Sequence, residues 1–185
     1  APAAPSRDEL ARREQERAER QRLEQARIDA AHARAADEAA ALWAAGADGG
    51  EGRACPYLER KGVQAHGVRV AADGWLLVPM RDAAGKLWNV QRIAPAELQD
   101  GGPDKLFLKG GRKSGLWHML GSTEPAPDVL LLAEGYATAA SLHEATGYPV
   151  AVAFDAGNLV HVTKALRAQY PTALLVLCGD DDVQT

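Results

Sequence analysis

The carboxyl-terminal third of the sequence alternates short apolar runs with segments of helical spacing, and this alternation limits the possible folds most strongly. Apolar runs of this length that lack polar alternation are typical of strands buried on both faces. The expected strands are 129–133, 150–154 and 173–178, and the expected helices between them are 136–146 and 158–170. A strand–helix–strand–helix–strand order predicts parallel strands with right-handed crossovers. Because three strands make a thin sheet, we expect a truncated layer.

Residues 51–127 show a different, mainly β pattern. The turn Asp82–Gly85 lies between two strand-like runs and predicts a hairpin with a glycine-containing loop. A short helix is expected at 58–62. The expected strands are 68–70, 75–80, 86–93, 105–109 and 116–120.

Residues 6–45 are predicted to form one long helix. Ser6 followed by Glu9 is a capping box, and the stretch 26–45 is rich in alanine, the strongest helix former. Glycines after residue 45 end the helix. Large apolar residues are sparse, so the helix has little surface to bury in a core. It fits either a connector between domains or an arm that binds a partner.

Composition excludes several classes of protein. The chain has 185 residues, of which 46% are hydrophobic, enough for one ordinary domain or two small ones. Its apolar runs are far shorter than the ~20 residues of a membrane helix, and no secretion signal opens it. Cys55 and Cys178 are too few and too far apart for a structural zinc site. We therefore expect a reduced, cytoplasmic protein without zinc or membrane contact.

Charge is unevenly distributed along the chain, although the net charge is only −4. Residues 51–127 carry 11 basic and 8 acidic side chains, whereas residues 128–185 carry 2 basic and 7 acidic ones. A basic middle beside an acidic end suggests a polyanion-binding surface next to a site for cations. Ordinary scatter of surface charge is the alternative.

Three carboxylates are expected at one edge of the predicted parallel sheet. Glu134 follows the first strand, and Asp180 and Asp182 follow the third, where Asp181 would face away. Crowded carboxylates favour a hard cation such as Mg²⁺, and Gly135 would allow close approach to the backbone. A solvated acidic loop is the alternative for the aspartate run.

Basic and aromatic side chains of the middle region are candidates for nucleic-acid contacts. Cations neutralise phosphates, a glycine pair at 110–111 would let amides join them, and aromatic rings stack on bases. Strand aromatics are, however, more often core residues. Histidines show no ligand spacing. Asp155 and Asn158 lie in a strand-to-helix turn, where capping is the simplest role and a contribution to the site is the alternative. The basic candidates are Arg81, Arg92, Lys105, Lys109, Arg112 and Lys113, and the aromatic ones are Trp88, Phe107 and Trp117.

Several motifs together resemble one known family. They are Leu132-Ala-Glu-Gly-Tyr-Ala-Thr-Ala, Ala153-Phe-Asp-Ala-Gly-Asn-Leu and Cys178-Gly-Asp-Asp-Asp, preceded by Tyr57-Leu-Glu-Arg-Lys-Gly-Val, Val78-Pro-Met-Arg-Asp, Asn89-Val-Gln-Arg-Ile and Lys105-Leu-Phe-Leu-Lys-Gly-Gly-Arg. In this order they resemble the Toprim module and preceding subdomain of plasmid-conjugation and satellite-phage DNA primases. The resemblance covers about residues 55–185. It implies a basic mainly-β subdomain (51–127) and a partial, Rossmann-like Toprim domain (128–185). With the helical arm expected from the residue pattern (1–50), the predicted fold is α+β.

The resemblance also implies a function. It assigns metal-linked acid/base chemistry to Glu134 and binding of Mg²⁺ or Mn²⁺ to Asp180 and Asp182. The substrates would be nucleoside triphosphates and a single-stranded DNA template, with a replicative helicase as a possible partner. Because the family's Toprim domain continues with further acidic residues, we expect an incomplete metal site. A Toprim nuclease or topoisomerase, and a non-catalytic nucleic-acid-binding or helicase-partner module, are the alternatives.

Overall fold

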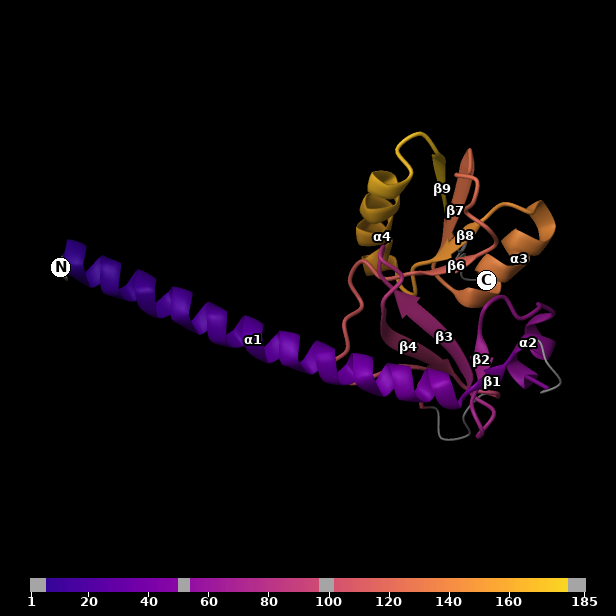
Figure 1. The fold of residues 1–185 in the computed structure, drawn as a ribbon, viewed down its shortest axis with the longest axis horizontal. Helices are drawn as coiled ribbons and strands as arrows, with labels where there is room; N and C mark the ends of the chain where they lie inside the picture. The colour runs from indigo at the N-terminus through magenta and orange to yellow at the C-terminus, as the bar shows by residue number, and fades with distance from the viewer. Residues whose placement is uncertain (1–5, 50–53, 97–101, 180–185) are drawn as a thin grey trace, which may run out of the picture.

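A computed structural model gives the fold and describes residues 6–49, 54–96 and 102–179. Two sheets lie next to each other, and the first part of the helix α1 (Arg7–Ala45) projects far away from both of them (Figure 1). The predicted long helix is thus confirmed. Ser6 caps it, because its hydroxyl accepts a hydrogen bond from the amide of Glu9 at 3.2 Å.

Only the last part of α1 packs on the body of the protein. Its buried residues are Ala35, Ala36 and Ala39, and Leu42 and Trp43 lie beside them. These small side chains let the helix lie close to the first sheet, where they meet Leu77, Val90 and Leu108. The preceding turns are almost wholly exposed.

The first sheet is antiparallel throughout and has the strand order β1-β2-β3-β4-β5. Its hairpin β3–β4 turns at Asp82–Gly85 as predicted, where the Gly85 amide donates to the Asp82 carbonyl at 2.9 Å. The short helix α2 (Pro56–Lys61) starts two residues earlier than expected. The strands are β1 (Ala47–Asp48), β2 (Arg69–Val70), β3 (Leu76–Arg81), β4 (Leu87–Ile93) and β5 (Lys105–Phe107).

The second sheet has the order β6-β8-β7-β9, in which β8, β7 and β9 are parallel and β6 is an antiparallel edge. Helices α3 and α4 cover opposite faces (Figure 1). This confirms the predicted alternation and a mixed fold with a sheet containing parallel strands. The elements are β6 (His118–Leu120), β7 (Val129–Ala133), α3 (Tyr136–Thr146), β8 (Val150–Val152), α4 (Ala156–Gln169) and β9 (Leu174–Cys178).

Three details differ from the sequence prediction. β1 was not expected, since two residues carry no periodicity. The strand predicted at 105–109 ends at Phe107. The strand predicted at 116–120 lies within the basic region 51–127 but pairs with β8 of the second sheet, and it starts only at His118.

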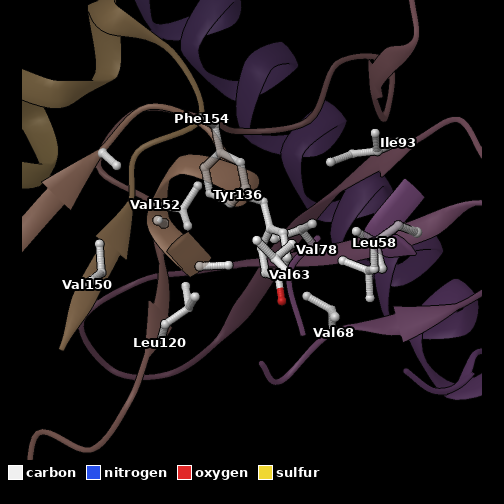
Figure 2. Packing of buried hydrophobic residues seen from close by; sticks show 14 of the residues in the cluster. Leu58, Val63, Val68, Val78, Ile93, Leu120, Tyr136, Val150, Val152 and Phe154 are labelled. Atoms are coloured by element: carbon white, nitrogen blue, oxygen red, sulfur yellow. The ribbon is translucent and has the colours of Figure 1, made fainter. Parts of the chain in front are cut away.

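The two sheets share one hydrophobic core. Val78 of the first sheet packs in the same cluster as Val150 and Val152 of the second, with the ring of Tyr136 between them (Figure 2). Burying apolar side chains from both sheets in one core removes them from water together and holds the sheets in one relative position. No helix of the described residues is both long enough and apolar enough to span a bilayer.

Candidate functional site

The three parallel strands end at the same edge of the second sheet. Ala133, the last residue of β7, lies opposite Val152 of β8 and Cys178 of β9. Glu134 therefore stands at the middle of this carboxyl edge, as the sequence predicted. Such edges are where ligands bind in open sheets of this kind.

The carboxylate of Glu134 is uncommitted. It is half-buried, and it makes no hydrogen bond or ion pair with any residue that the structure describes. Among the described residues, space is open beside it: a side chain added at Gly135 would meet only the hydroxyl of Thr138, at 4.0 Å, and one added at Gly179 would meet none of them within 4 Å. A free carboxylate beside two uncrowded glycines fits a hard, partly hydrated cation.

The other two predicted metal ligands, Asp180 and Asp182, lie outside the described residues. Their convergence with Glu134 remains a prediction. Within residues 6–49, 54–96 and 102–179, no three His, Cys, Asp or Glu side chains gather as a metal site.

The basic loop that follows β5 reaches this same edge. Lys113 Nζ lies 3.3 Å from Asp155 Oδ2 and 4.8 Å from the ring centroid of Phe107. Phe107 meets Phe154 edge-on, with 6.3 Å between ring centroids. Phe154 holds a left-handed backbone (φ 74°), a conformation that costs energy without glycine and persists only where surroundings enforce it. The loop and the carboxyl edge are therefore joined by a charge pair and by ring packing.

Asn158 holds the loop through its side chain, whereas Asp155 is the residue that caps α4. The Asp155 carboxylate accepts from the Asn158 amide at 2.9 Å, so the predicted capping is confirmed for Asp155 and wrong for Asn158. The Asn158 side chain is 4% exposed; it donates to the carbonyls of Leu116 and Ala153 and accepts from the amide of Gly115 at 2.8 Å. The prediction for Asn158 failed because two of these partners, Gly115 and Leu116, lie 43 and 42 residues away along the chain. The Ala-Gly-Asn motif was the only sequence signal for it.

Arg81 and Arg92 have partners within the first sheet and its turns. Arg81 donates to the carbonyl of Gly85 at 2.9 Å, and burial lowers its pKa, with a further contribution from Arg69. Arg92 pairs with Asp73 at 2.8 Å and lies over the ring of Trp75. Its buried Nε has no partner among the described residues. Both guanidinium groups help to hold the first sheet together.

The remaining candidates are more accessible. Lys105, Lys109 and Lys113 are exposed, and Arg112 is half-buried beside Trp88, with 5.2 Å from its Cζ to the ring centroid. Lys113 is paired as described above, whereas Lys105 and Lys109 have no ion pair with any described residue.

The aromatic candidates also differ in how deeply they are buried. Trp117 is a core residue with 7% exposure, and Phe107 packs against the core, as expected for strand aromatics. Trp88 is half-buried; its indole Nε1 donates to Asp82 Oδ2 at 2.7 Å. Burial raises the pKa of Asp82, but the hydrogen bonds from Trp88 and from two turn amides outweigh it and lower the pKa overall.

A polar cluster between the sheets was not anticipated as a unit. The buried imidazole of His118 donates through Nε2 to the His66 carbonyl at 2.7 Å, and burial lowers its pKa to about 4. Tyr136 Oη accepts from the His66 amide and donates to the carbonyl of Gln64, while burial raises the pKa of this phenol. Because the Tyr136 hydroxyl is fully engaged, it is unsuited to act as a nucleophile.

Comparison with known proteins gives a family match over most of the second sheet. Residues 128–184 match the family profile of the Toprim domain. This segment therefore resembles a Toprim domain. It begins at β7, so that β6, which precedes the matched segment, adds an antiparallel strand to the Toprim sheet.

Two curated relatives cover more of the chain. A DNA primase TraC of Escherichia coli is 43% identical over 133 residues, which is 70% of this chain and 12% of the relative. A second DNA primase TraC of Escherichia coli is 42% identical over 131 residues, 69% of this chain and 9% of the relative. The chain therefore spans only about a tenth of these proteins. No solved structure gave a significant match.

The predicted resemblance to Toprim-type DNA primases is thus confirmed. Since the matched length exceeds the 57 residues of the Toprim segment, the similarity extends into the region before it.

Proposed function

We propose that the chain is part of the catalytic core of a DNA primase that synthesises RNA primers on single-stranded DNA in plasmid or phage-type replication. The observation that carries this proposal is the free Glu134 carboxylate at the Toprim edge, with a basic loop fixed beside it through Lys113 and Asp155. An acidic edge beside a basic loop suits a reaction between a polyanionic template and triphosphates. The cytoplasm, where templates and nucleotides occur, is the expected location, and a replicative helicase is a possible partner.

Glu134, Asp180 and Asp182 would hold Mg²⁺ or Mn²⁺. Such an ion would supply charge neutralisation where the primer 3′-hydroxyl attacks the α-phosphate. Glu134, which makes no hydrogen bond or ion pair with the described residues, would accept a proton or act as a ligand. Exposed Lys109 and Lys105 would bind phosphates of the template or the incoming nucleotide.

The proposal is tested by primer synthesis with the full-length protein. Replacing Glu134→Gln or Asp180→Asn keeps side-chain size and removes the charge, so primer yield should fall by about 100-fold or more, the scale seen when transition-state stabilisation is lost. Binding of single-stranded DNA should change less than about twofold, since these carboxylates repel rather than bind phosphate.

Asp181→Asn is the matched control, because Asp181 is predicted to face away from the edge. Primer yield like that of the unmodified protein from the Glu134→Gln variant would refute the assignment. A covalent protein–DNA adduct would instead indicate topoisomerase chemistry. Salt-dependent DNA binding without Mg²⁺-dependent nucleotidyl transfer would indicate a non-catalytic binding module.

A further inference from the structure

A groove runs between α1 and the basic loop 109–114. Its three adjoining hollows, of about 460, 350 and 420 Å³, share lining residues along α1. Ala31 and Arg34 on the helix and Gly110 on the loop line the first two, and His32 links the second to the third. We call this the α1 groove.

The groove exists because glycine lets the loop pass close to the helix. Gly110 has φ 73°, a left-handed conformation, and a side chain added there would lie 3.4 Å from the Cβ of Ala31. The alanines that pack α1 on the sheet bring the two walls together without filling the space between them. A larger residue at position 110 would strain the backbone and narrow the groove.

Positive charge predominates in the α1 groove. Arg34 on the helix and Lys109 on the loop line the same hollow, and neither makes an ion pair within the described part of the chain. Two acids share the lining, Asp29, which accepts from Gln25, and Glu38. The basic side chains of the lining are Arg34, Lys109, Arg112 and Arg27, the last of which pairs with Glu24 at 2.7 Å. Arg34 and Lys109 stand on opposite walls and have no ion-pair partner among the described residues. They therefore indicate an anionic ligand that is long enough to touch both walls.

The third hollow adds an aromatic surface. Trp88 and Arg112 line it together with His32. The indole of Trp88 is fixed by its hydrogen bond to Asp82, and two cations contact its ring: Lys86 Nζ at 3.7 Å and Arg112 Cζ at 5.2 Å from the centroid. Indole rings and guanidinium planes both stack on exposed bases. An acidic peptide would use the cations but not this surface.

The groove is continuous with the candidate catalytic edge. Lys109 to Arg112 line the groove, and the next residue, Lys113, pairs with Asp155 at the Toprim edge. Asn158 fixes the end of the same loop. An extended polyanion bound in the groove would therefore lead to the edge that carries Glu134.

We propose that the α1 groove binds single-stranded DNA, with α1 as one wall of the template path. This proposal rests on the proposed primase function and assigns a role to the helical arm. Arg34 and Lys109 would contact successive phosphates, and Trp88 would stack on a base. Bases in a duplex are already stacked on one another, so this arrangement favours a single strand.

The test is binding of a fluorescent oligo-dT to the 185-residue chain, measured by anisotropy over a series of salt concentrations. The double variant Arg34→Ala/Lys109→Ala should bind about tenfold more weakly. The slope of log K against log[salt] should fall by about 1.4, since each single-strand phosphate contact contributes about 0.7. Trp88→Leu should bind about tenfold more weakly with an unchanged slope, and it should lose part of the tryptophan quenching caused by oligo-dT.

The control is Arg12→Ala/Arg22→Ala, which removes the same charge from the exposed part of α1, outside the groove. It should bind like the unmodified chain. The proposal is overturned if the chain does not bind oligo-dT, if the control loses as much affinity as the groove variant, or if Trp88→Leu leaves both affinity and quenching unchanged. The primase assignment is decided separately, by primer synthesis with the Glu134→Gln and Asp181→Asn variants.

Discussion

The Toprim sheet and α1 are attached to the first sheet in different ways. Around the second sheet, an apolar core is reinforced by buried polar side chains that bond to the backbone: His118 and Tyr136 bind the segment 64–66, and Asn158 binds the loop end at Gly115 and Leu116. Between α1 and the sheet, contact depends mainly on small side chains, Ala35 and Ala39, and the polar contacts lie at the end of the helix, where Arg69 donates to the carbonyl of Trp43 and lies over its ring.

This difference affects what each contact can position. A buried amide with three hydrogen bonds tolerates only one arrangement, because any other leaves polar groups unsatisfied. Alanine side chains bring the helix and the sheet close together, but apolar contacts have no preferred direction and fix the orientation of the helix less strictly than hydrogen bonds would. The sheet–sheet contact therefore fixes the basic loop against the Toprim edge, whereas the α1 contact leaves one side of the helix free to form the groove.

The largest expected effect concerns His118. Its folded pKa is about 4 and its unfolded value about 6.5, so between these values only the unfolded chain takes up the proton. Stability therefore falls as pH decreases from 6.5 to 4, by roughly 3 kcal/mol for this group. In urea unfolding at pH 7, 5.5 and 4, the His118→Gln variant should lack this part of the decrease. Identical pH profiles for both proteins would show that His118 does not hold the sheets together in its neutral form.

Asn158 gives the next largest effect. Asn158→Ala removes one acceptor and two donors and leaves buried backbone groups unpaired, so the free energy of unfolding should fall by about 2 to 3 kcal/mol. Hydrogen exchange at the Gly115 amide should accelerate. The control on the same helix is Thr163→Val, whose hydroxyl bonds only to the carbonyl of Leu159 and whose loss should cost less than about 0.5 kcal/mol. Equal stability of the two variants would mean that the loop is held by packing alone.

Local sequence patterns were sufficient for much of the fold. Capping by Ser6, alanine content and the glycine turn at Asp82–Gly85 act over a few residues, and α1 and the β3–β4 hairpin were predicted from them. The alternation of apolar runs also placed Glu134 at a strand end, because periodicity determines where a strand stops.

Long-range partners decided what the sequence could not predict. The strand β6 pairs with β8 because β8 would otherwise have an unpaired side in the second sheet. The local sequence of β6 does not indicate which strand it pairs with. The strand β9 leaves Leu174 and Leu177 60% and 54% exposed, although its composition matches that of the buried strand β7. Charge alone likewise could not separate Arg92, which pairs with Asp73, from the uncommitted Lys109.

The α1 contact should respond to volume rather than to polarity. Ala39 is fully buried against the first sheet, so Ala39→Leu adds three carbons to a space without room for them. Overpacking of this kind should lower the free energy of unfolding by about 1 to 2 kcal/mol, measured by urea denaturation. It should also displace the helix from the loop and weaken oligo-dT binding, because the α1 groove depends on the position of both walls.

Ala18→Leu provides the comparison, since Ala18 lies on the exposed part of the same helix and leucine is nearly as good a helix former as alanine. Stability and oligo-dT binding should both stay close to those of the unmodified chain. If Ala39→Leu lowers stability but leaves oligo-dT binding intact, α1 is attached where the structure places it, yet it is not a wall of the template path. If neither property changes, the close alanine contact does not set the position of the helix, and the contrast with the polar contact between the sheets is lost.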